Sequence, residues 1–583
     1  MPKFQNKTVL VTGSGTGIGQ AITKKFVENG ASAIILGRRK EPLEETAKML
    51  EGIIKEKQSN ATIKIFDGVD VSDEKAVTGM FDTLKSKNVN LDVVVNNAGV
   101  SGPVTCFAHA PFDEFRSTVD IHLTGTFWTS VQSLKVMKEG AKIITISTFF
   151  AEERPLEQRP YRFRGPYTAS QGAKNRLVEA MSWELTEKGI ISIGTNPGPV
   201  HSDRIYKTVY PKAASEFLRV SGFENLTPEE VESANKEILG LLGEDDETVK
   251  AGIKSAAQKL GKEEATLTNL LNRVKSIAEK IQKNTSTMIP DQQFLSQEQV
   301  ATTVLTLADD EQAKILNGKI IPGDRVFYPV KPHIASYIPP IKKNNFHVRC
   351  FIIHEMDERK RAGNILKKLH DAGAIVAGYS TTTDRLGKAA RVEMSGTAEL
   401  VKGKIELFIH FTGQFVTNKT LVVGDDSESN TSYGGDLTGT PLIGLQRNEW
   451  DKLVNKFINN PAEVTQGAIK HFVPGGSNDP RKFEGKKGRI VIIGPSLPAG
   501  KKISGHARAK VEVFRGALRS FVTTVNQELS DVLKSKIRVF LILPGSVNGK
   551  ESDDLDIMNT INYLLSDELE SSSEVIFCPD ETR

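Results

Sequence analysis

Residues 12–19 read Thr-Gly-Ser-Gly-Thr-Gly-Ile-Gly, and this stretch decides the fold. It lies between the apolar run Thr8–Val11 and a helix-like stretch at residues 20–29. Closely spaced glycines let a backbone turn sharply, approach a pyrophosphate and direct the free N–H groups of a helix start toward it. We therefore expect a dinucleotide site, although glycine-rich loops also serve as ordinary turns. The residues expected to contact the nucleotide are Gly13, Ser14, Thr16, Gly17, Ile18 and Gly19.

The glycine turn begins a regular alternation of short apolar runs and helical periodicity that continues to about residue 200. The expected strands are Thr8–Val11, Ala33–Leu36, Ile63–Asp67, Val93–Val95, Lys142–Ile146 and Ile191–Thr195. Strands separated by helices imply right-handed crossovers. The sequence therefore predicts an α/β fold with a doubly wound parallel sheet of the Rossmann type.

Residues 201–298 interrupt this alternation and are rich in Lys, Glu, Ala and Leu. Helical spacing recurs in three stretches, which are Thr227–Leu242, Glu247–Leu260 and Glu264–Lys283. The sheet pattern then returns at Gln299–Leu307 and Gly318–Ile321. We interpret residues 1–330 as one domain that carries a helical insertion.

Residues 331–345 contain several prolines and resemble an extended linker, after which residues 346–583 repeat the first pattern more faintly. Lys142–Ser147 is echoed by Arg489–Gly494, and Asn196–Val200 by Leu543–Val547. The expected elements of this half are Val348–Ile353, Asp357–Ala372, Ala374–Gly378, Ile405–Phe411, Arg489–Ile493, Ala509–Leu533, Ile537–Leu543 and Val575–Cys578. We predict a duplicated fold whose second copy lacks the glycine turn, and which acts either as a scaffold or as a partner that shapes the site.

Composition excludes several classes of protein. The 583 residues carry a formal net charge of +4, with 76 basic and 72 acidic side chains, so no strong field favours nucleic acid. The three cysteines are far apart, which argues against disulfides and a metal site and predicts small core residues. The sequence contains no run of about 18 apolar residues and no signal-peptide pattern, so we expect a cytoplasmic protein without a membrane span.

Further motifs follow the expected strands in a fixed order. Asp70 follows the third strand, Asn96-Asn97-Ala98-Gly99 the fourth, Ser147-Thr148 the fifth and Pro197-Gly198 the sixth, while Tyr167 begins a helix. With the glycine turn, this ordered set resembles the short-chain dehydrogenase/reductase family across residues 1–330. The resemblance implies that Asp70 contacts adenine, that Asn97, Ala98 and Gly99 support the sheet and cofactor, and that Pro197 and Gly198 lie by the nicotinamide. It makes Tyr167 the general acid, where the alternative is a structural tyrosine.

Cofactor choice follows from the end of the second strand, which reads Leu36-Gly37-Arg38-Arg39-Lys40. An acidic residue here would accept a hydrogen bond from the ribose of NAD, whereas a guanidinium pairs with a 2′-phosphate. Arg38 and Arg39 therefore favour NADP(H), unless they are ordinary solvated charges at a helix start.

The sequence departs from the family at three catalytic positions. Gln171 stands where the lysine four residues after the tyrosine is usual, His122 replaces an asparagine, and Thr148 occupies the serine position beside Ser147. A phenol with an ordinary pKa near 10 needs a cation to work at neutral pH. An imidazolium at His122 is the preferred replacement and Lys174 the other, while a degraded reductase that only binds cofactor is the alternative.

The loop between Thr148 and Tyr167 is long and rich in arginine, which together with the insertion and the second copy resembles the C-terminal half of bifunctional malonyl-CoA reductases. The resemblance implies NADPH-dependent reduction of malonyl-CoA to malonate semialdehyde with release of CoA. Arg164, three residues before the tyrosine, would bind the malonyl carboxylate, and Arg204 would meet CoA.

Two other functions stay open at this point. One is a carbonyl reductase for malonate semialdehyde or a 3-oxoacyl substrate, and the other is an NADPH-binding protein without catalysis. Members of this family often pair through helices, which makes a homodimer one expectation, although a covalent tandem can form a similar pairing internally.

Overall fold

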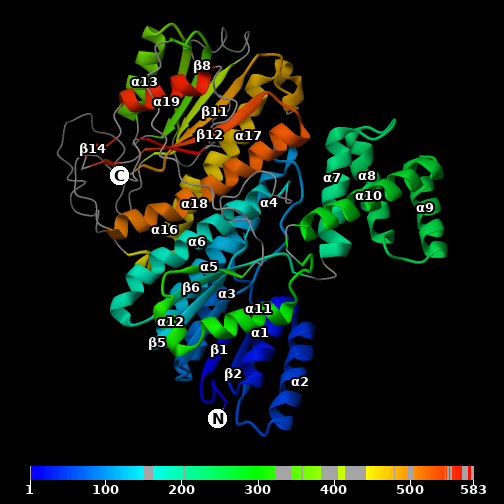
Figure 1. Ribbon diagram of the computed structural model, residues 1–583, viewed down its shortest axis with the longest axis vertical. Coiled ribbons are helices and arrows are strands. Elements are labelled where there is room, and N and C mark those ends of the chain that lie inside the picture. The colour runs from blue at the N-terminus through cyan, green and yellow to red at the C-terminus, as the bar shows by residue number, and fades with distance from the viewer. Residues whose placement is uncertain are drawn as a thin grey trace.

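The first domain is built on a seven-stranded parallel sheet in the order β3-β2-β1-β4-β5-β6-β7 (Figure 1). Its strands are β1 (Thr8–Thr12), β2 (Ser32–Leu36), β3 (Ile63–Phe66), β4 (Leu91–Asn96), β5 (Met137–Ile146), β6 (Ile191–Pro197) and β7 (Ile320–Gly323). The sheet order reverses between β1 and β4, which is where doubly wound folds bind their ligands. The predicted Rossmann-type fold is thus confirmed.

The structure is a computed structural model, and some segments lie outside the part that it describes. The described residues are 2–149, 162–200, 205–287, 289, 291–323, 343–355, 359–381, 405–413, 441–477, 479–496, 505–544, 546–547, 550–551, 554–566 and 575–578. Most of the linker expected at 331–345 therefore lies outside the described residues, and so does Arg204.

Helices cover both faces of the first sheet because each buries an apolar stripe against it. One face carries α1 (Gly17–Glu28) and α11 (Gln297–Leu307), which share a buried cluster with β1 that includes Phe26 and Val304. α2 (Lys40–Glu56) packs beside α1, and α12 (Asp310–Ile315) follows α11. The opposite face carries α3 (Glu74–Ser86), α4 (Phe112–Val119), α5 (Gly125–Ser133) and α6 (Gly165–Leu185).

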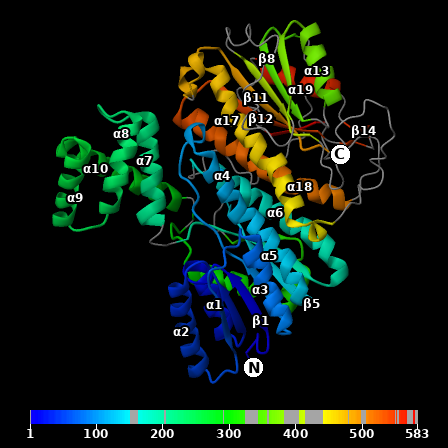
Figure 2. The same ribbon diagram turned by 180° about the vertical axis from the view of Figure 1, so that it is seen from behind.

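The insertion between β6 and α11 forms a separate helical lobe, which stands beside the domain body in both views (Figures 1 and 2). Its helices are α7 (Tyr210–Ser221), α8 (Pro228–Ile238), α9 (Asp246–Leu260) and α10 (Glu264–Ser286). They enclose an apolar core of their own, which includes Leu218, Val231, Ile253 and Leu270. The helical spacing predicted the last three of these helices and missed α7.

The second domain repeats the first sheet in the order β9-β8-β10-β11-β12-β15, and every pairing in it is parallel. This order matches β2-β1-β4-β5-β6-β7 strand for strand, so the predicted duplication is confirmed. Its strands are β8 (Arg349–Glu355), β9 (Ile375–Thr381), β10 (Leu407–Phe411), β11 (Gly488–Ile493), β12 (Ile537–Pro544) and β15 (Val575–Cys578), with a separate hairpin of β13 (Ser546–Val547) and β14 (Lys550–Glu551).

The helices of the second domain also correspond to those of the first. They are α13 (Arg359–Asp371), α16 (Arg447–Val454), α17 (Asn460–Phe472), α18 (Gly505–Gln527) and α19 (Asp554–Leu565). A π-helical turn at Asp120–Thr124 joins α4 to α5, and a similar turn at Asn455–Asn459 joins α16 to α17. The helix expected over Ala509–Leu533 instead ends at Gln527 and continues as a π-helical turn at Glu528–Val532.

The two domains join through α6 and α18, which lie side by side between the sheets (Figures 1 and 2). The helices cross closely because both have glycine at the contact: a Cβ at Gly516 would lie 2.7 Å from the carbonyl oxygen of Gly172, and one at Gly172 would collide with the carbonyl oxygen of Gly516. Since each glycine meets the other, the domains are related by an approximate twofold axis at this crossing.

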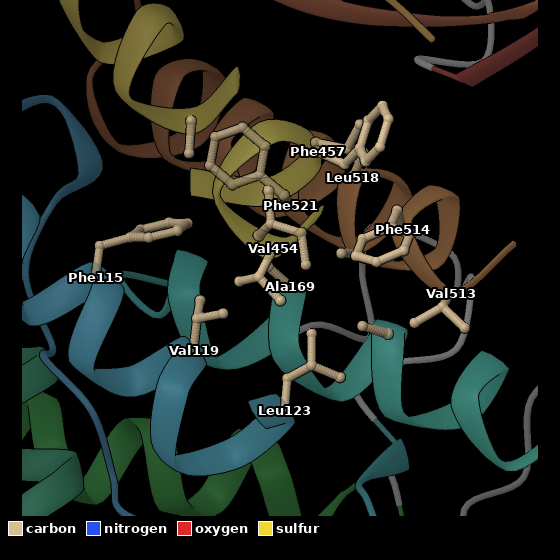
Figure 3. Packing of buried hydrophobic residues seen from close by; sticks show 14 of the residues in the cluster. Phe115, Val119, Leu123, Ala169, Val454, Phe457, Val513, Phe514, Leu518 and Phe521 are labelled. Atoms are coloured by element: carbon tan, nitrogen blue, oxygen red, sulfur yellow. The ribbon is translucent and has the colours of Figure 1, made fainter. Parts of the chain in front are cut away.

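A single apolar core crosses this junction, as Figure 3 shows. The rings of Phe127 and Trp450 stack with centroids 3.8 Å apart, and the indole N–H of Trp450 donates to Thr124 at 3.1 Å. Buried side chains from both domains meet in Figure 3, among them Phe115, Val119, Leu123, Ala169, Val454, Phe457, Phe514, Leu518 and Phe521. Cys106 and Cys350 are free and buried, as the sequence predicts.

Candidate active site

A cavity of about 1030 Å³ opens at the carboxyl ends of the strands of the first sheet, across the switch point between β1 and β4. It brings together sequence-predicted residues that are up to about 180 positions apart in the chain. Those that line it are Gly13, Thr16, Gly17, Ile18, Gly19, Arg38, Arg39, Asp70, Asn97, Ala98, Gly99, His122, Ser147, Thr148, Arg164, Tyr167, Gln171, Pro197 and Gly198. Lys174 lines it too.

The glycine turn is shaped for close approach of a ligand. Gly13 and Gly17 have φ values of 67° and 63°, in the left-handed region that favours glycine. A Cβ at Gly19 would collide with the carbonyl oxygen of Gly13, so the helix start must pack directly on the turn. The side-chain amide of Asn97 braces the turn by donating to the carbonyl oxygen of Thr12 at 2.9 Å. The free N–H groups at the start of α1 therefore face a rigid, shallow cradle that fits a pyrophosphate.

Ser14 has a different place from the other residues of the turn. It is fully buried, and its hydroxyl accepts a hydrogen bond from the backbone N–H of Leu36 at 2.9 Å. It ties the turn to the end of β2 beneath the cavity.

Charged groups line the open end of the cavity beyond β2. The Arg38 side chain is 62% exposed, and its guanidinium lies 3.6 Å from the Asp70 carboxylate. Asp70 is oriented by Ser72, whose backbone N–H and hydroxyl donate to the same carboxylate oxygen at 2.9 and 2.7 Å. Arg39 is also exposed, directly before α2. A phosphate here would meet two arginines, one of which would have to share its charge with Asp70.

Tyr167 lies in the first turn of α6 and faces the deep end of the cavity. The Arg164 guanidinium carbon lies 3.8 Å from the centroid of the Tyr167 ring, which is a cation–π contact. Arg164 is buried, and its Nη2 donates to the carbonyl oxygen of Ser101 at 2.7 Å. The residue predicted to bind the substrate carboxylate thus also places a permanent positive charge against the predicted acid.

His122 and Gln171 form a buried pair beside the tyrosine. The two atoms His122 Nδ1 and Gln171 Nε2 lie 3.1 Å apart, and His122 Nε2 lies 2.8 Å from the carbonyl oxygen and 3.2 Å from the backbone nitrogen of Val100. The rings of His122 and Tyr167 meet edge to face with centroids 5.2 Å apart. The Oε1 atom of Gln171 is buried and has no hydrogen-bond partner among the residues that the structure describes. Rotating this amide by 180° would let Oε1 accept from Nδ1, so that an imidazolium could donate through both ring nitrogens.

Ser147 and Thr148 continue from the end of β5 into the cavity wall, and both are buried. The Ser147 hydroxyl donates to the backbone oxygen of Gln171 at 3.1 Å, and its backbone N–H donates to Thr195 at 2.9 Å. These bonds fix the strand end against α6. The Ser147 hydroxyl is therefore used in a structural hydrogen bond to α6. Thr148 is the next residue of the cavity wall.

Lys174 does not reach back to Tyr167. Its side chain is 1% exposed, and Nζ donates to the carbonyl oxygen of Ile146 at the end of β5. Burial lowers the pKa of Lys174 from 10.5 to about 7. It therefore places a titratable amine in the cavity wall, one turn of α6 beyond Gln171.

Comparison with known proteins places this site in a family. The family model for short chain dehydrogenases matches residues 7–210. The uncharacterized oxidoreductase YxbG of Bacillus subtilis is 30% identical over 250 residues, which are 42% of this chain and 83% of the relative. The chain belongs to the short-chain dehydrogenase family. A 3alpha-hydroxysteroid dehydrogenase of Mediterraneibacter gnavus is also 30% identical, over 204 residues that are 35% of this chain and 77% of that enzyme.

Two solved structures share the tandem arrangement of this short-chain dehydrogenase. The N-domain of a bacterial malonyl-CoA reductase, solved with NADP, covers 100% of this chain and 99% of its own at a TM-score of 0.68. The C-domain of such a reductase, also solved with NADP, covers 96% and 94% at 0.66. Both are 15% identical to this chain, so the likeness describes the fold. The shared fold therefore extends over both domains.

The equivalent place in the second domain of this short-chain dehydrogenase is filled by Arg515. The crossing of Gly172 with Gly516 aligns Arg515 with Gln171. Arg515 is 1% exposed, and its guanidinium donates to the carbonyl oxygens of Pro495 at 3.1 Å and Pro544 at 2.7 Å.

Pro495 and Pro544 correspond in position to residues that line the cavity of the first domain. The sheet register pairs Ile146 with Thr195 and Ile493 with Ile542, so Pro495 matches Thr148 and Pro544 matches Pro197. Arg515 therefore bonds across the space in which the first domain keeps its cavity open.

Two kinds of feature are absent from the described part of the chain. Among these residues, no helix is long and apolar enough to cross a membrane. Nor do they bring together three or more His, Cys, Asp or Glu side chains that could hold a metal ion.

The sequence did not indicate several residues of the cavity wall. Val100 and Ser101 extend the Asn-Ala-Gly motif, Ile205 and Val209 lie directly before α7, and Gln297 begins α11. The position of Val100 and Ser101 directly after β4 was the available signal, because loops after parallel strands line such sites.

Proposed function

We propose that this short-chain dehydrogenase is an NADPH-dependent reductase with one site per chain, in the first domain. The observation that carries the proposal is the single cavity wall that joins the glycine cradle to Tyr167. The cradle fits a pyrophosphate, and Arg38 and Arg39 lie where a 2′-phosphate would reach. Two structures with the same tandem fold were solved with NADP, which supports the choice.

Bound NADPH would supply a hydride to a carbonyl carbon beside Tyr167. The phenol of Tyr167 then donates a hydrogen bond to the carbonyl oxygen as negative charge develops on it. Arg164, against the ring face, places a positive charge beside the phenol, where the family has its lysine. His122 contributes when it is an imidazolium, with Gln171 accepting from its Nδ1. Thr148 offers a second hydroxyl in the cavity wall.

The substrate that this arrangement supports best is malonyl-CoA or a similar acyl-CoA thioester. Hydride addition to the thioester carbon forms an oxyanion, which collapses as the carbon–sulfur bond breaks and the thiolate takes a proton. Malonate semialdehyde and free CoA are the products. A fixed guanidinium at Arg164 suits the malonyl carboxylate, because the fork geometry binds a carboxylate with two parallel hydrogen bonds.

The test is NADPH oxidation by the purified chain with malonyl-CoA while a thiol probe reports free CoA. We expect one CoA released for each semialdehyde formed. NADPH oxidation with malonate semialdehyde but not with malonyl-CoA would assign the carbonyl-reductase function instead. Binding of NADPH without oxidation in the presence of either substrate would reduce the protein to a nucleotide-binding role.

The assignment of Arg164 has its own test. Arg164→Lys keeps a positive charge but loses the fork, so the ratio of activity with malonyl-CoA to activity with acetyl-CoA should fall by about tenfold. Lys212, an exposed cation of the insertion lobe, provides the matched control as Lys212→Gln, which should leave the ratio unchanged. An equal loss with both thioesters would reject the carboxylate contact.

A further inference from the structure

Two buried glutamates cross the junction between the domains at equivalent places. Glu184 lies 13 residues after Gln171 near the end of α6, and Glu528 lies 13 residues after Arg515, directly after α18. The Glu184 carboxylate accepts from the backbone N–H groups of Leu442 and, at 3.0 Å, Ile443. Each domain thus sends one carboxylate into the backbone of the other.

The contacts of Glu528 differ in one partner. Glu528 accepts from the backbone N–H of Phe107 at 2.6 Å, and Phe107 matches Leu442 because each begins a short 3-10 turn before the equivalent helices α4 and α16. The other Glu528 oxygen accepts from the backbone N–H of Phe163 at 3.0 Å. Phe163 immediately precedes Arg164. Only the second-domain carboxylate therefore holds a segment that leads into the candidate active site.

Phe163 needs to be held. Its φ is 68°, in the left-handed region that a bulky residue rarely adopts and that costs about 1–3 kcal/mol. Glu528 fixes its N–H, and its carbonyl oxygen accepts from the backbone N–H of Thr105 at 3.1 Å. A second contact from the same domain joins Arg162 to Asp531 at 3.0 Å. These bonds determine the direction in which the chain enters α6, and with it the place of Arg164.

The surroundings of Glu528 act on its pKa in opposite directions. Burial raises the pKa of Glu528 to about 8, while the two backbone N–H bonds oppose the shift. Glu216 lies close by, where it accepts from the backbone N–H of Cys106 at 2.6 Å and pairs with Arg219 at 2.7 Å. Arg219 balances the charge of Glu216, and the amides of the first domain are left to stabilise Glu528.

We propose that Glu528 is a positioning residue for the active site of the first domain: by fixing the strained Phe163, the second domain holds Arg164 against Tyr167. The inference rests on the proposed function and deepens it, since it gives the second domain a part in substrate recognition. Glu184 is a matched control, because it also accepts from two backbone N–H groups across the junction, and neither Leu442 nor Ile443 lines the cavity.

The experiment compares Glu528→Gln and Glu528→Ala with Glu184→Gln and Glu184→Ala in the full chain. We expect kcat/KM for malonyl-CoA to fall by about a hundredfold in Glu528→Ala, mainly through KM, because an ångström of misplacement has effects of that size. Glu528→Gln, which keeps one acceptor oxygen, should recover part of the loss. The affinity for NADPH should not change. Both Glu184 variants should lose a similar amount of thermal stability and keep kcat/KM within about twofold of the wild type.

Hydrogen exchange separates this inference from the proposed function. The Phe163 amide should exchange faster in both Glu528 variants, and the Leu442 amide in both Glu184 variants, whatever substrate the protein uses. If the wild type reduces no thioester, the proposed function fails while exchange at Phe163 still reports whether Glu528 holds it. The positioning role is overturned if Glu528→Ala keeps wild-type kcat/KM, or if Glu184→Ala loses as much.

A milder variant covers the case in which the Glu528 variants do not fold. Asp531→Asn removes the half-exposed ion pair to Arg162 on the same segment. It should raise KM for malonyl-CoA severalfold at constant NADPH affinity, and an unchanged KM there would count against the inference.

Discussion

α6 and α18 are two copies of one helix with opposite outcomes. Both follow an equivalent strand, both cross at glycine and both contribute to one shared core. On α6, Tyr167 and Gln171 line an open cavity. The matching positions on α18 are Val511 and Arg515. The guanidinium of Arg515 forms hydrogen bonds across the space that is equivalent to the cavity. The interface needs both copies, while a site needs only one. Packing is thus retained on both sides, and an open cavity on one.

The pairing itself resembles a dimer folded into one chain. Helices that family members often use between subunits here join two halves of the same polypeptide, through α4, α5 and α6 on one side and α16, α17 and α18 on the other. Because the partner is covalently attached, its residues can specialise. The contact of Glu528 with Phe163, which has no equivalent at Glu184, is such a specialisation.

The largest expected effect comes from Tyr167. Tyr167→Phe keeps the ring beneath Arg164 and removes only the acidic hydroxyl, so NADPH oxidation with malonyl-CoA should fall by about 10³-fold or more. NADPH affinity, measured by fluorescence titration, should be unchanged. A variant that retains a tenth of wild-type activity would show that another group is the acid.

Arg38 tests the cofactor end of the same cavity. Arg38→Asp should shift the preference from NADPH toward NADH by about tenfold to a hundredfold, because a carboxylate repels the 2′-phosphate and accepts from the ribose hydroxyl. The ratio of kcat/KM for the two cofactors is the measurement. Arg361, an arginine of the second domain paired with Asp554, is the control as Arg361→Asp. An unchanged ratio in Arg38→Asp would reject the assignment.

The glycine crossing tests whether the two copies depend on each other. Gly172→Val and Gly516→Val should each lower the free energy of unfolding by about 1–3 kcal/mol, since added methyl groups press on the backbone of the facing helix. Urea unfolding measures it. Gly467→Val on α17, where a Cβ would meet nothing within 4 Å, should cause no comparable loss, because valine is a better helix former than glycine. Equal losses at all three positions would contradict the close crossing.

The dependence of stability on pH has opposite signs at two buried groups. The pKa of Glu528 is raised from 4.5 to about 8, so the folded state binds the extra proton and stability falls as pH rises through that window. The pKa of Lys174 is lowered from 10.5 to about 7, so the unfolded state binds the extra proton and stability rises from about pH 7 to 10.5.

Two variants separate these contributions. Glu528→Gln should flatten the decline between about pH 5 and 8, and Lys174→Met should flatten the rise above about pH 7, as followed by urea midpoints. A Lys174→Met profile that matches the wild type above pH 7 would show that the amine is not buried as the structure describes.

The sequence predicted what depends on local pattern. The glycine turn, the strand alternation and the order of the motifs after each strand are short-range features, and they led to the sheet and to most of the cavity wall. The duplication could also be predicted, because Arg489–Gly494 repeats the pattern of a basic residue and a β-branched run in Lys142–Ser147.

Features that depend on contacts between distant segments could not be predicted. Glu528 and Phe163 are 365 positions apart, and nothing in either segment indicates the other. The bonds of Arg515 to Pro495 and Pro544 could not be predicted either, because they depend on how β11 and β12 pair in the sheet. Lys174 was weighed as a neighbour of Tyr167, whereas helix geometry sends it to Ile146 instead.

The most direct test of the account is the number of NADPH molecules bound per chain, measured by isothermal titration calorimetry. An open cavity in the first domain and Arg515 in the equivalent place of the second predict one molecule per chain. Two equivalents would contradict the filled second site, and none would contradict the nucleotide site of the first domain.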